Sequence, residues 1–348
     1  MDAAPRPRVL DELILTVVVD NETDTLSSID TGVPQLPEVG SHLGRVEPTV
    51  HDGKTCYQVF DHLCVACHGY SVVATARAGD AAHTVLFDVG PYGDVWLDNA
   101  ERLGIDLAAI EVLVLSHWHW DHSGGIPTVA AAIAKARRDA GRDPLVVDLH
   151  PDRPDQRGVE VSPGSIVTLP PEPSIDEIER AGGRTVLSDA VHLVGGDLFV
   201  ASGPIPRRTS YETGLVGHQS FRGGVATPDP LIMDERFLAA HVGGRGLTVL
   251  SACSHAGVVN ACLGARELFG DEAVDVVLGG YHLAGAAMEP RIADTVGDLE
   301  RLIAPKVVAP GHCTGWRAKA ALAERFAPGR YGPSMVGSTY VLRGDGEG

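Results

Sequence analysis

The sequence lacks any long apolar run and is poor in positive charge. Residues 13–19 form one of its longest aliphatic runs, which is far too short to span a bilayer. Among 348 residues, Lys and Arg number 28 and Asp and Glu number 46, so the formal net charge is −18. Such a chain repels nucleic-acid phosphates and anionic membranes, and we expect neither as a partner. The N-terminal residues also lack the apolar stretch of a secretory signal, so we expect a cytoplasmic protein.

Cysteine is scarce, and several common functional strings are missing. The six cysteines do not suffice for a disulfide scaffold in so long a chain, which favours a reducing compartment. Cys64 and Cys67 have the spacing of a redox or zinc motif, but no second pair completes a four-thiolate site. The strings G-x-x-x-x-G-K-[ST], G-x-G-x-x-G and G-x-S-x-G do not occur. Nucleotide-phosphate binding and a serine-hydrolase nucleophile therefore have no support in the sequence.

The hydrophobic pattern predicts a layered α/β protein. Hydrophobic residues make up 44% and charged residues 21%, which is typical of a globular chain with a sizeable core. Strands are predicted at 13–19, 70–76, 84–88, 112–115, 145–149, 164–169, 184–187, 198–201, 247–251, 274–278, 306–308 and 338–342, and helices at 96–103, 126–140, 258–269, 291–302 and 316–326. The alternation of the two places sheets inside and helices outside. We treat residues 1–348 as one domain, with a lid or insertion at about 21–62.

Histidine is the compositional oddity, with 15 residues, and it gathers in one segment. Residues 116–125 read Ser-His-Trp-His-Trp-Asp-His-Ser-Gly-Gly and follow a predicted buried strand. His117 and His119 are two residues apart, so they point the same way in an extended segment, and Asp121 continues that alternation. His122 then turns off as the chain enters a helix. One segment can thus present two imidazoles to one metal ion and a carboxylate plus an imidazole to a second.

This segment resembles the signature of the metallo-β-lactamase superfamily. Further pieces resemble the branch of the methanopterin-pathway dihydropterin synthase: Cys-His-Gly-Tyr-Ser at 67–71, Asn-Ala and Leu-Gly-Ile-Asp within 99–106, Cys-Ser-His-Ala-Gly-Val-Val-Asn at 253–260, Gly-Gly-Tyr-His-Leu at 279–283 and Pro-Gly-His-Cys-Thr-Gly at 310–315. The resemblance implies a four-layer αββα sandwich. It also implies that Asp88 is a structural aspartate that steadies the site.

The remaining metal ligands are expected at the ends of later strands, where sites of α/β sheets are built. The resemblance implies that His255 is a ligand and that His312 binds the ion shared with Asp121 and His122. The role of His282 is left open: it could be a metal ligand, a proton shuttle or a hydrogen-bond partner of a ligand. We treat seven other histidines as surface or core residues: His42, His51, His62, His83, His192, His218 and His241.

Four residues are candidates for the substrate side of the site. Arg207 precedes Glu212 by five residues in a loop, and an arginine grips a carboxylate or phosphate with two parallel hydrogen bonds. The alternative for this stretch is a solvated loop. His68 and His150 are lower-ranked candidates for a contact with the substrate.

The ligand set favours a metal-dependent hydrolase. Two divalent ions, zinc first and manganese or iron as alternatives, would bind a water between them and lower its pKa from about 15.7 toward 7. The resulting hydroxide, oriented by Asp121, would attack an acyl or phosphoryl centre of a small molecule, with His282 as proton donor. The alternatives are a synthase that condenses a pterin diphosphate with an aromatic amine, and an iron-dependent oxidoreductase. We expect a small-molecule substrate and allow for a homodimer.

Overall fold

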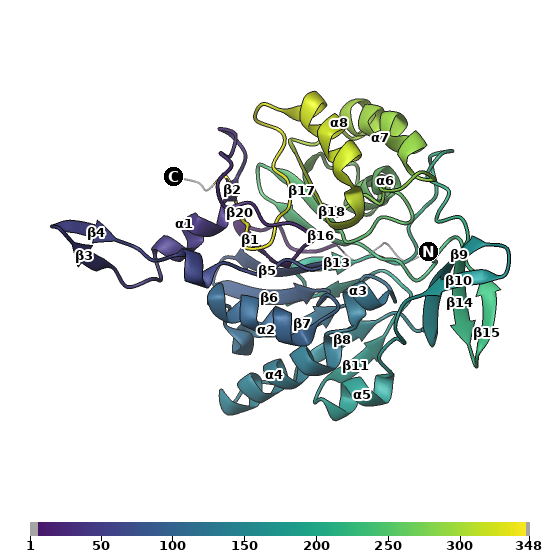
Figure 1. Ribbon diagram of the computed structural model, residues 1–348, viewed down its shortest axis with the longest axis horizontal. Helices are drawn as coiled ribbons and strands as arrows, with labels where there is room; N and C mark the ends of the chain where they lie inside the picture. Colours follow the sequence, from purple (N-terminus) through teal and green to yellow (C-terminus); the bar gives the residue numbers. More distant parts are fainter. Residues whose placement is uncertain (1–5, 346–348) are drawn as a thin grey trace.

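Two β-sheets packed face to face form the centre of the computed structural model, which describes residues 6–345 (Figure 1). The larger sheet has eight strands in the order β11-β8-β7-β6-β5-β1-β20-β2. Its strands are β1 (Glu12–Val19), β2 (Gln35–Leu36), β5 (Ser71–Ala78), β6 (Ala81–Phe87), β7 (Ile110–Val114), β8 (Val146–Leu149), β11 (Arg184–Leu187) and β20 (Thr339–Arg343).

The smaller of these two sheets has six strands in the order β12-β13-β16-β17-β18-β19. Its strands are β12 (His192–Val194), β13 (Phe199–Ala201), β16 (Leu238–Val242), β17 (Gly246–Ser251), β18 (Val274–Gly280) and β19 (Val307–Gly311). Strand β18 runs parallel to both β17 and β19. Every residue of β18 is buried, as expected for a strand covered on both faces.

Helices cover the outer face of each sheet. Over the larger sheet lie α2 (Gly93–Arg102), α4 (Ile126–Asp139) and α5 (Ile175–Arg180). Over the smaller sheet lie α6 (Val258–Phe269), α7 (Ile292–Asp298), which a π-helical turn (Leu299–Ile303) continues, and α8 (Trp316–Phe326). Residues of β1 show how the layers arise, since Leu13 and Leu15 pack between the sheets while Val18 packs beneath the helices. The predicted α/β sandwich is confirmed.

The chain between β8 and β16 builds a third sheet that the sequence analysis only partly anticipated. Its four strands, in the order β10-β9-β14-β15, are β9 (Gln156–Ser162), β10 (Ser165–Thr168), β14 (His218–Arg222) and β15 (Val225–Pro228). Most residues of β10 and β15 are exposed. Of these four strands only β10 was predicted, because the buried positions of β9 and β14 include the polar residues Arg157, Gln219 and Ser220, which give no hydrophobic alternation.

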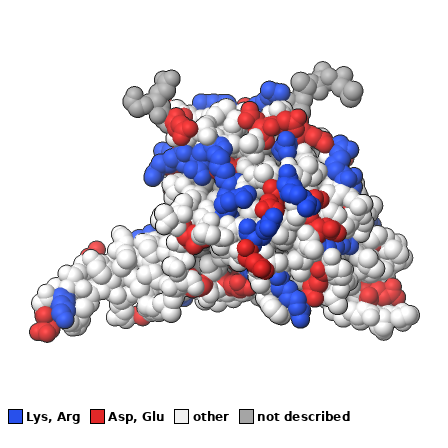
Figure 2. Space-filling model, turned by 90° about the horizontal axis from the view of Figure 1, so that it is seen from above, with Lys and Arg blue, Asp and Glu red and all other residues white. Residues whose placement is uncertain are grey.

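Residues 21–62, predicted as a lid or insertion, contain β2, helix α1 (Glu38–Leu43) and the hairpin of β3 (Thr49–His51) and β4 (Lys54–Cys56). The hairpin projects away from the sandwich at the left of Figure 1. The same arm extends to the left in Figure 2, where acidic and basic side chains are interspersed over the face in view. Within residues 6–345, no helix combines the length and apolarity that crossing a membrane requires.

Candidate metal centre

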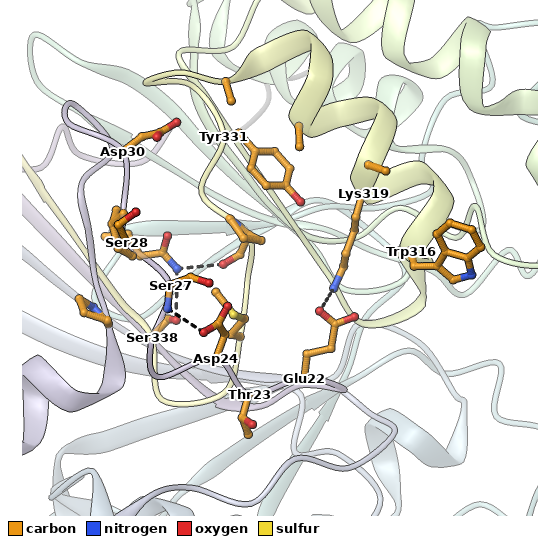
Figure 3. A pocket seen from close by; sticks show the side chains of 18 residues that line it. Glu22, Thr23, Asp24, Ser27, Ser28, Asp30, Trp316, Lys319, Tyr331 and Ser338 are labelled. Atoms are coloured by element: carbon orange, nitrogen blue, oxygen red, sulfur yellow. Dashed lines mark hydrogen bonds and ion pairs between the residues drawn. The ribbon is translucent and has the colours of Figure 1, made fainter.

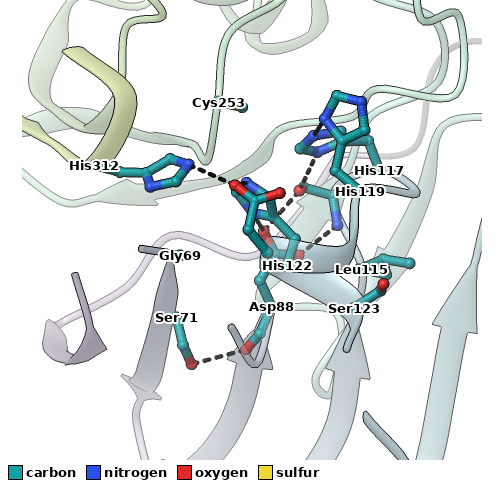
Figure 4. Close-up of polar contacts among 12 residues, drawn as sticks. Gly69, Ser71, Asp88, Leu115, His117, His119, His122, Ser123, Cys253 and His312 are labelled. Carbon is teal, nitrogen blue, oxygen red and sulfur yellow. Dashed lines mark hydrogen bonds and ion pairs between the residues drawn. The ribbon is translucent and has the colours of Figure 1, made fainter. Parts of the chain in front are cut away.

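The predicted ligands come together at one edge of the sandwich. His117 and His119 follow β7, and the short helix α3 (Trp120–Ser123) carries Asp121 and His122. The loop after β17 carries His255, and the turn after β19 carries His312. Both sheets thus contribute the carboxyl ends of parallel strands to the same place. Figure 4 shows His117, His119 and His122 beside one another, with His312 approaching from the opposite side.

Three imidazoles form a first group of nitrogen donors. Nε2 of His117 lies 2.9 Å from Nδ1 of His119, and Nε2 of His255 lies 3.2 Å from that same Nδ1 atom. One ring nitrogen from each of the three lies within 4.8 Å of the others, and all three side chains are buried. Three convergent imidazole nitrogens are the donor set of many catalytic zinc sites.

Asp121 joins two further imidazoles in a second group. Its Oδ2 atom lies 3.3 Å from Nε2 of His312 and 3.6 Å from Nε2 of His122. Both nitrogens are buried and make no hydrogen bond within the described chain. A buried polar atom without a partner is costly, so these two nitrogens are suited to bind a ligand. A carboxylate and two imidazoles therefore fit a second divalent cation.

A network behind the first motif fixes which ring nitrogens are free. The Asp88 carboxylate accepts hydrogen bonds from the backbone N–H and the hydroxyl of Ser116 and from Nδ1 of His122. The Ser116 oxygen lies 2.8 Å from Nδ1 of His117 and accepts its proton, since the hydroxyl hydrogen goes to Asp88. In His117 and His122, Nε2 is thereby the ring nitrogen that remains to face a metal ion. Asp88 lies where the motif resemblance implied, behind the ligands.

His119 is oriented by a residue that the sequence analysis treated as an ordinary core or surface histidine. Nε2 of His119 lies 2.9 Å from Nε2 of His218, and Nδ1 of His218 lies 2.7 Å from the carbonyl oxygen of Asp229. Because a carbonyl only accepts, His218 donates from Nδ1 and accepts at Nε2 from His119. His119 then carries its proton on Nε2 and leaves Nδ1 free.

Asn21 orients the His312 ring through a hydrogen bond, as His218 does for His119. Its Oδ1 atom accepts from Nδ1 of His312 at 2.9 Å, and its Nδ2 donates to Nδ1 of His68 at 2.9 Å. Nε2 of His68 lies 3.4 Å from the Asp121 carboxylate, so His68 stands next to the second group, at its solvent side. Asn21 was not predicted because its neighbours in sequence carry no metal-binding pattern.

The electrostatics of the site suit cation binding. Burial holds the pKa of His117, His119 and His255 well below the ordinary value, and neighbouring cationic groups lower it further. These imidazoles are therefore neutral at pH 7, the form that binds metal. Burial alone would raise the pKa of Asp121, but the imidazoles of the second group outweigh it and hold the pKa below the usual range. Asp121 is an anion at any physiological pH.

The two groups open into a cavity of about 610 Å³. Asp121, His282 and His68 line it together with His218 and the two sulfur-bearing residues Cys253 and Cys313. The outer walls are apolar and come mainly from the third sheet: Val159, Val161, Val167, Leu169, Leu215 and, from α8, Trp316. His282 faces the first group, since its ring centroid lies 4.2 Å from that of His255.

The structure does not bring Arg207 and Glu212 into this cavity. Arg207 donates to the carbonyl oxygens of His255 and Leu231. The buried Glu212 carboxylate accepts from the backbone N–H groups of Val259 and Asn260 in the first turn of α6. These contacts satisfy helix N–H groups that lack partners in the helix itself, so Glu212 caps α6 at a position that does not line the cavity.

A second cavity, of about 670 Å³, adjoins the first (Figure 3). Glu22 and Trp316 line both cavities. Lys319 of α8 points toward Glu22, and the two charged groups lie 2.9 Å apart. The remaining lining is largely hydroxyl, carboxylate and alanine side chains. The candidate metal centre thus lies in a cavity with a second cavity beside it.

The motifs, the sandwich and the site geometry agree with the comparison to known families. Residues 66–268 match the family model described as the metallo-beta-lactamase superfamily. The chain belongs to this superfamily. The resemblance drawn from the motifs is therefore confirmed, and so is the fold that it implied.

Individual relatives show which members of the superfamily this chain is similar to. The chain is 29% identical over 269 residues to a protein of Methanocaldococcus jannaschii named 7,8-dihydropterin-6-methyl-4-(beta-D-ribofuranosyl)-aminobenzene-5'-phosphate synthase, a match that covers 74% of this chain and 85% of that one. An uncharacterised protein of the same organism is 26% identical over 78% of this chain and 91% of its own length. A solved structure titled as a metal-dependent hydrolase of the beta-lactamase superfamily superposes with a TM-score of 0.65 and 23% identity, over 95% of this chain and 99% of that one.

Proposed function

We propose that the protein is a metal-dependent hydrolase that acts on an acyl or phosphoryl centre of a small molecule. The observation that carries the proposal is the convergence of six donors in two groups, with two buried ring nitrogens that have no partner in the described chain. The first group, His117, His119 and His255, would hold one divalent cation. The second group, Asp121, His122 and His312, would hold the other. Zinc fits this mixture of imidazole and carboxylate best, and manganese or iron would also fit.

A pair of such cations, when bound, would lower the pKa of a water molecule and polarise the carbonyl or phosphoryl oxygen of the centre under attack. Three side chains would position the water, supply a proton and contact the substrate. Asp121, held as an anion, orients the attacking water by accepting one of its protons in a hydrogen bond. His282 stands at the cavity wall beyond His255 and donates a proton to the leaving group. His68 contacts the substrate at the solvent side of the second group.

The charge of the cavity favours a substrate with little negative charge. Among the described residues that line it, none is Lys or Arg, while Glu22 and Asp121 bring two carboxylates. The bound cations alone would balance a substrate anion. The apolar walls fit an acyl chain or an aromatic group, and the adjoining recess with Lys319 and Glu22 gives room for a polar extension.

The synthase activity is the second candidate, and the 29% identical relative favours it. In this reaction the chain would join a pterin carrying a diphosphate to an aromatic amine. A diphosphate requires several positive charges, and the cavity offers them only through its cations. We therefore place hydrolysis first and use the condensation as the competing outcome of the same assay.

Metal analysis combined with a substrate screen tests the proposal. The purified protein is analysed for bound elements and assayed with lactones, phosphodiesters, phosphonates and pterin precursors, before and after chelation. We expect zinc and a hydrolytic product that disappears on chelation and returns with added metal. His117→Ala and Asp121→Asn should each lower kcat/KM by about 10²–10³-fold, the loss typical of one removed electrostatic contact. The exposed His51 lies on the projecting hairpin, and His51→Ala is the control that keeps full activity.

Three outcomes would contradict the proposal. Hydrolysis that survives complete chelation would exclude the two cation groups as its source. A condensation product formed without hydrolysis would replace the proposal by the synthase activity. Iron as the sole bound metal, with an absorption band in the visible range and no hydrolysis of any screened substrate, would replace the proposal by the oxidoreductase chemistry.

A further inference from the structure

Two cysteine sulfurs meet in the wall of the metal cavity, and the proposed hydrolysis uses neither. The Sγ atoms of Cys253 and Cys313 lie 3.2 Å apart, and both residues are free thiols that line the cavity. Cys313 is partly exposed, whereas Cys253 is buried. A reagent that enters the cavity would therefore reach Cys313 first.

The backbone is arranged so that these two side chains can touch. Cys253 follows β17 and Cys313 follows β19, the two strands that flank β18. The strands pair at Ser251 with Gly279 and at Gly280 with Gly311, so the cysteines reach over the end of β18. A Cβ atom on Gly280 would lie 2.7 Å from the Cys313 sulfur. The glycine therefore leaves the space in which the sulfurs meet.

Each cysteine is adjacent to a candidate metal ligand of a different group. Cys253 stands two residues before His255, and Cys313 directly follows His312. A disulfide has a length of about 2.05 Å, so bond formation would draw the two sulfurs together by about 1 Å. The two ligand-bearing loops would move with them, and a metal site tolerates only a few tenths of an ångström of displacement in its ligands.

We propose that Cys253 and Cys313 form a reversible disulfide that controls how tightly the site binds its cations. The formation of the disulfide does not depend on the proposed function, whereas its effect on cation affinity rests on the two cation groups. The oxidant is a low-molecular-weight disulfide of the glutathione type.

The exchange proceeds in two balanced steps. The thiolate of Cys313 attacks one sulfur of the oxidant, which expels one thiolate and leaves a mixed disulfide on Cys313. The thiolate of Cys253 then attacks Sγ of Cys313, forms the intramolecular bond and expels the second thiolate. The cysteine pair loses two protons and two electrons, and the oxidant is reduced to two thiols.

Peptide mapping tests whether the bond forms. The full-length protein, stripped of metal, is incubated with oxidised glutathione and digested without reductant. We expect one cross-linked peptide pair that joins Cys253 to Cys313 and that separates on reduction. Cys253→Ser should instead retain glutathione on Cys313, and Cys56→Ser, on the projecting hairpin, should cross-link like the wild type. A glutathione adduct that persists on Cys313 in the wild type, or no reaction at either residue, would overturn the proposal.

Zinc titration against a chromophoric chelator tests the coupling. We expect the oxidised protein to bind zinc at least about tenfold more weakly than the reduced protein, and its zinc affinity to recover on reduction. A loss of this size is typical when a residue that supports a metal ligand is changed. Cys313→Ser should bind zinc equally before and after the oxidant. Thermodynamic linkage requires that saturating zinc lower the equilibrium constant of disulfide formation by the same factor. A cross-linked protein with unchanged zinc affinity would overturn the control of cation binding while leaving the hydrolase proposal intact.

Discussion

The Nε2 atoms of His119 and His218 share a hydrogen bond of 2.9 Å, although the residues are 99 positions apart. His119 belongs to the loop after β7, and His218 begins β14 of the third sheet. The bond holds the proton of His119 on Nε2, so Nδ1 is left free for the proposed first cation. The third sheet thus contacts the candidate metal centre directly.

This bond predicts that His218→Ala weakens the first cation site. Loss of a partner behind a metal ligand typically costs 10–100-fold in affinity, and we expect a zinc dissociation constant raised by about that factor. His218→Gln keeps an acceptor near His119 and should recover part of the loss. Competition with a chromophoric chelator measures both variants. Equal zinc affinity in His218→Ala and wild type would show that His119 needs no such support.

Asp88 is predicted to be essential for the fold behind the site. Its carboxylate accepts three hydrogen bonds in a fully buried position. In Asp88→Asn the side-chain NH₂ group can only donate, yet it must face hydrogen-bond donors of Ser116 and His122. At least one buried donor is therefore left without an acceptor. We expect the free energy of unfolding of the metal-free protein to fall by about 3–5 kcal/mol, as when a buried charged partner is removed.

Urea unfolding measures this loss, with Asp106→Asn as the matched control. Asp106 caps a short turn at an exposed position, and asparagine caps as well as aspartate does. The control should therefore unfold like the wild type. If Asp88→Asn were as stable as its control, the network through Ser116 and His122 would not hold the loop in place.

Glu212 is predicted to matter for stability and not for substrate binding. Its carboxylate also accepts from the Thr209 hydroxyl at 3.0 Å, besides the two N–H groups of α6. Glu212→Ala removes these acceptors and should lower the free energy of unfolding by about 1–2 kcal/mol, the usual cost of a lost helix cap. KM should not change. A raised KM at unchanged stability would restore the substrate role that its sequence position first indicated.

His192 and Asp148 should make the stability of the fold depend on pH. Nε2 of His192 lies 2.6 Å from the Asp148 carboxylate and Nδ1 lies 2.8 Å from the carbonyl oxygen of Ala190. Both partners only accept, so the imidazole carries two protons. The hydrogen bond to Asp148 accordingly raises the pKa of His192, although burial opposes it. A folded-state pKa above the unfolded value of about 6.5 means that the stabilisation is complete below pH 6.5 and is lost as pH rises through the folded pKa.

The measurement is the free energy of unfolding of wild type and His192→Asn between pH 5.5 and 9. We expect the wild type to be more stable by about 1 kcal/mol at the acidic end, with the difference shrinking toward pH 9. His51→Asn, on the exposed hairpin, should track the wild type throughout. A difference that grows with pH would mean that His192 is neutral in the fold.

The sequence by itself predicted the sandwich, and its motifs, through the family resemblance that they carry, indicated the two sets of proposed ligands. Strong β-branched runs mark the buried strands, and a histidine follows β7, β17 and β19 within a few residues. Because parallel strands end at a common edge, position along the chain predicts that these histidines lie near one another, and the resemblance chose His255 and His312 among the histidines that follow strands. The same logic placed His282 at the cavity but did not give it a role.

Only the tertiary structure decided which residues support those ligands. His218 reaches His119 across 99 positions, Asn21 reaches His312 across 291, and Cys253 reaches Cys313 across 60. Glu212, which looked like a pocket residue, turned out to cap α6. Local periodicity reports whether a residue is buried and on which face of its element it lies. It carries no information on which distant element packs there, because pairing between sheets is fixed by the packing of the whole core.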